Sequence, residues 1–228
     1  MNNNLLQIKI KQRLNKLASL DYDSLECWQI AEAFNKAQLE WVRRKIKTGN
    51  ESSSKDITDL QVLIATVPIV GTMVNELYFE TPSLPDNFLD YKRVSFKGKK
   101  GDCPDRPFIV YLAEDADVDL LLSDTLSKPS FDWAETFCTL VGGKIRIYTN
   151  NEFEVINPKL SFYRKPVEVQ FMGCTDLNTG NSITADVKCE LKEDVIEILC
   201  DEAASILAGD IEAIMQYQRN EKSAEKNN

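Results

Sequence analysis

Histidine is absent from all 228 residues of the sequence. Its absence removes the commonest general base, the commonest zinc ligand and the Ser-His and Cys-His nucleophile pairs. The six cysteines form no C-x-x-C pair, and no apolar run reaches the ~18 residues that a membrane-spanning helix needs. Most reaction classes are thereby disfavoured, and we expect no catalytic, cofactor-binding or metal-ligating residues.

A signal peptide is also missing, since the chain starts Met1-Asn2-Asn3-Asn4 without a basic segment and an apolar core. We therefore expect the protein to be made and kept in a cytoplasm, where thiols stay reduced. In that compartment the cysteines are predicted to be small buried apolar side chains. They are Cys27, Cys103, Cys138, Cys174, Cys189 and Cys200.

Negative charge is the main feature of the composition. The formal net charge is -9 and the isoelectric point is about 4.8, with 43% apolar and 28% charged residues. An acidic surface repels phosphate backbones and anionic lipid, which disfavours a sequence-reading nucleic-acid binder. A wall past which DNA slides stays compatible with this charge, because such a wall should bind DNA weakly.

Apolar residues at helical spacing mark both ends of the chain. They predict helices over residues 4–19 and 24–47, a short helix over 57–66, and a long helix over 192–217. Asp23 is expected to cap the second helix. Helical segments therefore flank a middle part with a different pattern.

That middle part shows short apolar alternation bounded by turn residues. The strongest signal is a two-residue hairpin, with strands over 136–141 and 144–149 around Gly142-Gly143. Further strands are predicted over 152–156 and 160–164. Their alternation predicts a meander with one apolar face.

Three carboxylates alternate at Asp115, Asp117 and Asp119. A calcium loop would need glycine at its sixth position and glutamate at its twelfth, where Leu120 and Leu126 stand. We favour a solvated acidic surface over a metal site. An enzyme that uses these carboxylates alone is a weaker alternative.

A basic loop resembles a fragment of a phosphate-binding loop but lacks its spacing. Its residues are Lys97-Gly98-Lys99-Lys100-Gly101, without the G-x-x-x-x-G-K-[ST] pattern. We interpret it as an exposed hairpin tip, and docking on an acidic partner is the role we would expect if it has one.

Three segments resemble a known family. They are AFNKAQLEWVRR over 33–44, LSFYRKP over 160–166, and the pair DEAA over 201–204 with GDIE over 209–212. In these strings and in the order of its parts the chain resembles head–tail connector proteins, also called tail adaptors or ring proteins, of short-tailed phages. Among them it is most similar to the ring proteins of crAss-like phages.

The resemblance implies an α+β fold. In it the N-terminal helices and a long C-terminal helix form a helical bundle, with an inserted antiparallel β-rich region. On this basis residues 1–70 and 191–218 are assigned to the bundle and 71–190 to the insertion. Residues 219–228, which are polar and charged, are expected to be a flexible C-terminal tail.

The resemblance also implies a function at the head–tail junction of the virion. The protein would be a structural subunit of a ring, typically of twelve copies, that connects the capsid portal to the tail. Its partners would be further copies, the portal protein, adjacent tail ring proteins and passing DNA without sequence recognition, with no membrane. The alternatives are a lower tail-ring or tail-tip protein, or a cytosolic non-viral binding module.

Candidate interface residues come from the second predicted helix, the basic loop and the C-terminal end. They are Trp41, Arg43, Arg44, Lys99, Lys100, Tyr217, Arg219 and Lys222.

Overall fold

A computed structural model describes residues 1–17, 25–48, 58–176 and 179–226. The chain divides into two compact units. A helical unit comprises residues 1–62 and 166–228, and a strand-rich unit comprises residues 63–165.

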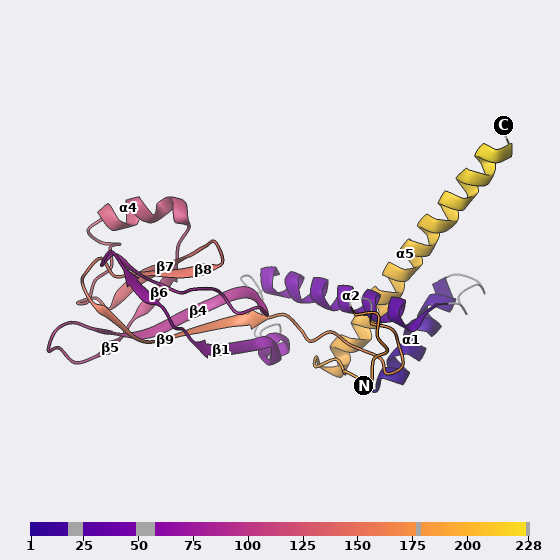
Figure 1. The fold of residues 1–228 in the computed structure, drawn as a ribbon, viewed down its shortest axis with the longest axis horizontal. Helices are drawn as coiled ribbons and strands as arrows, with labels where there is room; N and C mark the ends of the chain where they lie inside the picture. The colour runs from indigo at the N-terminus through magenta and orange to yellow at the C-terminus, as the bar shows by residue number, and fades with distance from the viewer. Residues whose placement is uncertain (18–24, 49–57, 177–178, 227–228) are drawn as a thin grey trace. The chain divides into compact units, whose positions relative to one another are not determined.

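The strand-rich unit contains two sheets (Figure 1). The first has four antiparallel strands in the order β1-β9-β4-β5. They are β1 (Ile64–Pro68), β4 (Phe88–Lys99), β5 (Arg106–Pro107) and β9 (Glu154–Arg164).

The second sheet has five strands in the order β2-β3-β8-β7-β6, and β6 runs parallel to β7. They are β2 (Thr72–Val74), β3 (Tyr78–Glu80), β6 (Ile109–Leu112), β7 (Glu135–Val141) and β8 (Lys144–Tyr148). A short 3-10 turn, η3 (Asp115–Asp117), and the helix α4 (Val118–Ser123) follow β6.

The core of this unit lies between the two sheets and is rich in phenylalanine. Phe108 is its centre, with ring centroids 5.0 Å from Phe96 and 4.2 Å from Phe153. Gly98 on β4 leaves room for this ring, because a Cβ there would come within 2.2 Å of the Phe108 side chain. Aromatic burial of this kind is the largest apolar contribution available to a small sheet core.

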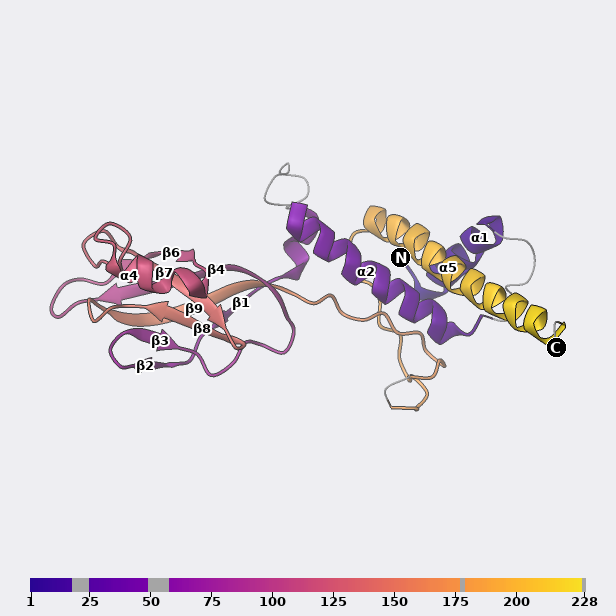
Figure 2. The ribbon, with the colours of Figure 1, turned by 90° about the horizontal axis from the view of Figure 1, so that it is seen from above.

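The helical unit contains α1 (Asn3–Leu17), α2 (Cys27–Thr48) and α5 (Glu193–Lys226). Helix α5 packs against both α1 and α2, as Figures 1 and 2 show, whereas α1 and α2 make few contacts with each other. Buried Ile10, Phe34 and Leu199, one from each helix, belong to this core.

Within the helical unit, the segment between β9 and α5 is held to α1 and α2 through side-chain amides. The Asn35 amide donates to the Val169 carbonyl at 3.1 Å and accepts from the Val169 N–H at 2.8 Å. The buried Asn3 amide donates to the carbonyls of Gln170 and Val187. These bonds replace a strand ladder, because the segment forms only isolated bridges.

The predicted fold class, a helical bundle with an inserted antiparallel β-rich region, is wrong. Two sheets of four and five strands make up a unit of their own, and the β6–β7 pair is parallel. The helices do not make a bundle, because the apolar face of α2 is shared with the 166–190 segment through Asn35 and Gln38. Helical periodicity reveals that a face is covered but not what covers it.

The predicted boundaries also change. The strand-rich unit is 63–165 instead of 71–190, since β1 replaces the end of the predicted 57–66 helix. Residues 58–60 are helical, as predicted, and lead into η2 (Gln61–Leu63). Helix α5 continues to Lys226, beyond the predicted start of a flexible tail at 219. The predicted cap Asp23 lies outside the described residues.

The cysteine prediction needs correction as well. Cys27 and Cys174 form a disulfide within the helical unit, and Cys103 is exposed. Cys138 and Cys200 are buried free thiols, as expected of small apolar side chains. Thiols at 27 and 174 are separated by 147 residues, so nothing local in the sequence indicates that they pair.

An ion-pair cluster joins α1 to α5. Lys9 and Arg13 donate to the Glu197 carboxylate, and Arg13 also pairs with Asp201. The hydrogen bonds from Lys9 and Arg13 hold the pKa of Glu197 below its ordinary value of 4.5. Because the folded-state pKa is depressed, the stabilisation is complete above about pH 4.5 and is lost as the pH falls through the folded-state pKa.

We predict that Glu197→Gln lowers the unfolding free energy at pH 7 by roughly 0.5–1 kcal/mol, since the carboxylate is partly exposed and screened. The difference from wild type should shrink at pH 3, where the wild-type carboxyl becomes protonated. Urea denaturation followed by circular dichroism measures both values. Glu32→Gln, at an exposed position on α2, is the control, and an equal loss for Glu197→Gln at both pH values would contradict this account.

Candidate functional site

Five large apolar or aromatic side chains remain exposed around β6 and line one pocket. We call them the β6 surface: Tyr111, Leu112, Leu120, Leu126 and Trp133. Leu126 is 90% exposed and Trp133 is 80% exposed. Scattered exposed apolar residues are ordinary on a monomer, but a group gathered at one pocket indicates a binding surface.

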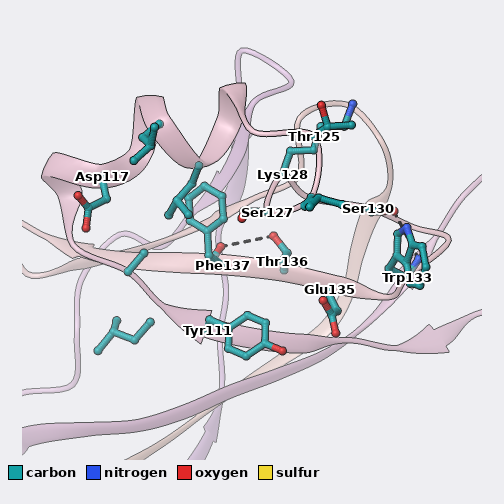
Figure 3. Close-up of a pocket in the computed structure, with 15 residues that line it drawn as sticks. Tyr111, Asp117, Thr125, Ser127, Lys128, Ser130, Trp133, Glu135, Thr136 and Phe137 are labelled. Atoms are coloured by element: carbon teal, nitrogen blue, oxygen red, sulfur yellow. Dashed lines mark hydrogen bonds between the residues drawn. The ribbon is translucent and has the colours of Figure 1, made fainter.

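The pocket has a volume of about 760 Å³. It lies between α4, the loop that follows α4, and the strands β6 and β7 (Figure 3). Phe137 rises from β7 toward α4 and forms its apolar floor, where its ring packs 4.7 Å from that of Tyr148. Pockets of this size and lining bind apolar groups of ligands or of partner proteins.

Charged groups at the pocket do not converge. Asp117 and Glu135 lie at different ends of it in Figure 3, so the two carboxylates do not face each other across a reacting atom. Lys128 and the hydroxyl side chains of Thr125, Ser127, Ser130 and Thr136 complete the polar part of the lining. This arrangement suits contact with a partner better than general acid–base chemistry, which needs paired groups within hydrogen-bond reach.

The backbone of β6 is unpaired along one side. The N–H groups of Ile109 and Ala113 donate to the carbonyls of Ala134 and Cys138 beside β7, each at 2.9 Å. Because successive residues of a strand point their N–H groups to opposite sides, those of Val110 and Leu112 point away from β7. No described strand pairs with β6 on that side. An edge of this kind can accept an added strand.

Free thiols offer no activated nucleophile in the buried regions. Burial raises the pKa of Cys138 to about 11 and that of Cys200 to about 11, and it also raises the pKa of Cys189. A thiol with a raised pKa stays protonated at neutral pH and reacts slowly.

Within residues 1–17, 25–48, 58–176 and 179–226, no three His, Cys, Asp or Glu side chains are placed to hold a metal ion. Across the same described ranges, no helix combines the length and apolarity needed to cross a bilayer.

The candidate interface residues of the sequence are divided between the two units. On α2, Trp41 is buried and so packs inside the helical unit, Arg43 is exposed, and Arg44 pairs with Glu202 of α5. Lys99 is exposed at the end of β4, while Lys100 pairs with Glu152 at 2.6 Å. The other three belong to α5, but their side chains lie outside the described part: Tyr217, Arg219 and Lys222.

The sequence did not predict the β6 surface. Asp115, Asp117 and Asp119 are exposed, yet the neighbouring Leu120 and Leu126 are exposed too. The segment that follows β6 contains many large apolar residues close to the four carboxylates of residues 114–119. Apolar side chains placed so near charged groups cannot all reach a core, and this was the signal that the sequence offered.

A scan of protein-family models finds none that matches the chain, and a search of curated proteins finds no significant match. The function must therefore be argued from the residues, from the geometry around β6 and from the three resembling segments.

We predict that replacing Leu126 and Trp133 together by serine lowers the binding of an apolar fluorescent dye by half or more. Both side chains are exposed, so the melting temperature should stay within about 2 °C of wild type. Val70→Ser with Met172→Ser, which removes exposed apolar groups elsewhere, is the matched control. Dye binding that is unchanged by the first pair, or lowered equally by both pairs, would show that the β6 surface is not a binding surface.

Proposed function

We propose that this protein is a non-catalytic structural subunit of a phage virion. Copies of it form the ring that connects the capsid portal to the tail. Its function is mechanical: it provides matched contact surfaces to neighbouring copies, to the portal and to the adjacent tail proteins, and it leaves a passage for DNA.

The β6 surface carries this proposal. A large exposed tryptophan and tyrosine beside a pocket are the side chains that most often anchor protein interfaces. The unpaired edge of β6 adds a row of backbone groups that a neighbouring chain can complete. A subunit that is stable alone needs neither feature, because exposed edges and apolar groups favour association.

The ring assignment draws on the resemblance of three segments to connector proteins. The first segment lies on α2 and the third on α5. The second covers the end of β9 and the two residues that follow it, Lys165 and Pro166. A ring of identical subunits also requires two different surfaces on each copy, because head-to-tail contacts close only when one surface meets another. The acidic net charge of -9 suits a wall past which DNA moves without being held.

Mass spectrometry of purified phage particles tests this proposal. We expect the protein in the particles, in a ratio to the portal protein that is constant between preparations, and cross-links between the two proteins. The purified protein mixed with its portal should form ring complexes visible by electron microscopy.

Absence of the protein from particles would refute the virion role and would favour a cytosolic binding module. Presence in particles with cross-links only to distal tail proteins would refute the position below the portal. Leu126→Asp with Trp133→Asp should lower incorporation at least tenfold, while Val70→Asp with Met172→Asp should not.

A further inference from the structure

The outer face of the first sheet carries a cluster of cations. Arg93 and Lys97 lie on β4, and Lys159 lies on the adjacent β9. In the ladder Arg93 is opposite Ser161 and Ser95 is opposite Lys159. Residues directly opposite in an antiparallel pair share one face, so these three cations are close neighbours.

That face is turned away from the core. The intervening residues Val94, Phe96 and Leu160 are buried between the sheets, whereas Arg93, Lys97 and Lys159 are exposed. Lys99, also exposed, continues the row on β4. It lies opposite the exposed Glu154 of β9, which is one carboxylate on the same face. We call these four cations the basic face: Arg93, Lys97, Lys99 and Lys159.

None of the four forms an ion pair within the part of the chain that the structure describes. Other cations of the same unit are paired, since Lys100 contacts Glu152, and Lys144 and Arg146 both contact Glu80. Like charges placed next to each other on a sheet repel. A protein of net charge -9 that keeps such a group unpaired is suited to an anionic partner at this face.

An anionic counterpart lies on the same unit. The exposed carboxylates Glu114, Asp115, Asp117 and Asp119 lie within the stretch 114–119, at η3 and the start of α4. They too lack an ion pair with any described residue. We call them the acidic segment.

The two groups lie on opposite sides of the strand-rich unit. Helix α4 covers the outer side of the second sheet, and the first sheet forms the other layer (Figure 1). The apolar core separates the layers, so the basic face and the acidic segment of one copy cannot meet. They can meet between two copies.

We propose that the basic face of one copy binds the acidic segment of a second copy. This inference rests on the proposed function in taking a further copy as the partner. Because the two surfaces are different and lie on opposite sides, the contact is head-to-tail and generates a closed ring or a filament.

Apolar contact accompanies the charges. Asp117 and Leu120 line the same pocket, so a copy that covers the acidic segment also covers part of the β6 surface. Exposed ion pairs contribute about 0–1 kcal/mol each. The charges therefore select and orient the partner, and the burial of Leu120 and its neighbours supplies most of the affinity.

A second copy explains the basic face better than DNA does. Four cations match four anions on the same unit, and the remainder of the acidic surface repels a phosphate backbone. Sheet cations without a groove-entering element would contact phosphates only, and the binding would weaken steeply with salt.

Charge reversal in the full-length protein tests the proposal. Arg93→Glu with Lys97→Glu reverses the basic face, and Asp115→Lys with Asp117→Lys reverses the acidic segment. Each pair alone should weaken self-association at least tenfold in sedimentation velocity experiments. An equimolar mixture of the two variants should restore association to within about threefold of wild type, because each variant supplies the complement of the other.

Two controls separate this contact from general charge effects. Lys36→Glu with Lys188→Glu changes the net charge by the same amount as Arg93→Glu with Lys97→Glu, but at exposed positions of the helical unit. This control pair should leave association unchanged. Wild-type association should also weaken as salt rises from 50 to 500 mM, because the Debye screening length falls from roughly 14 Å to roughly 4 Å.

Several outcomes would overturn the proposal. They are a wild type that stays monomeric at all accessible concentrations, association unaffected by either reversal, and variants that do not recover on mixing. Loss of duplex DNA binding on reversal of the basic face, with association unchanged, would assign that face to nucleic acid. Recovery on mixing by a protein absent from phage particles would keep the self-contact and refute the virion role.

Discussion

The position of β6 depends on how Phe108 is packed. Its ring lies between the two sheets against Phe96 and Phe153, and its N–H donates to the Phe96 carbonyl at 3.2 Å. The chain crosses from the first sheet to the second at this residue, after β5 and before β6. Since Phe108 points inward, the alternation of the strand directs Val110 toward the core and exposes Ile109 and Tyr111.

The exposed surface is therefore a consequence of the core. The same residue that closes the two sheets fixes the register of β6, and this register leaves apolar side chains and backbone groups without partners. The protein contains acidic, basic and apolar surfaces on one small unit, and the acidic and basic surfaces of one copy cannot meet because the apolar core separates them. An assembling subunit needs such surfaces, because a partner can neutralise the charges and cover the apolar groups only once it is in place.

The periodic patterns predicted the elements better than their arrangement. Helices α1, α2 and α5 and the β7–β8 hairpin follow directly from apolar spacing and from Gly142-Gly143. The bundle was wrong because apolar stripes do not identify their neighbours. Part of the face of α2 contacts the 166–190 segment, which forms no strand and is held by the side-chain amide of Asn35. Sequence periodicity gives no sign that a side-chain amide will make the hydrogen bonds that a neighbouring strand would otherwise make.

The candidate site was the least predictable part. Leu120, Leu126 and Trp133 look like core residues by type, and only their exposure in the folded unit shows that they lie outside it. The basic face was equally hidden, because Lys159 joins Arg93 and Lys97 through the β4–β9 register although more than 60 residues of sequence separate them. The predicted basic loop contained Lys97 and Lys99 but missed Arg93 and Lys159.

Hydrogen–deuterium exchange tests the central claim, that the β6 surface and its open edge are an interface. The amides of Val110 and Leu112 should exchange rapidly in the free protein, because no described strand accepts their hydrogen bonds. In the assembly that we propose, the peptide that spans 109–113 should become protected by tenfold or more. Equal exchange of this peptide in the free and assembled protein would contradict the account.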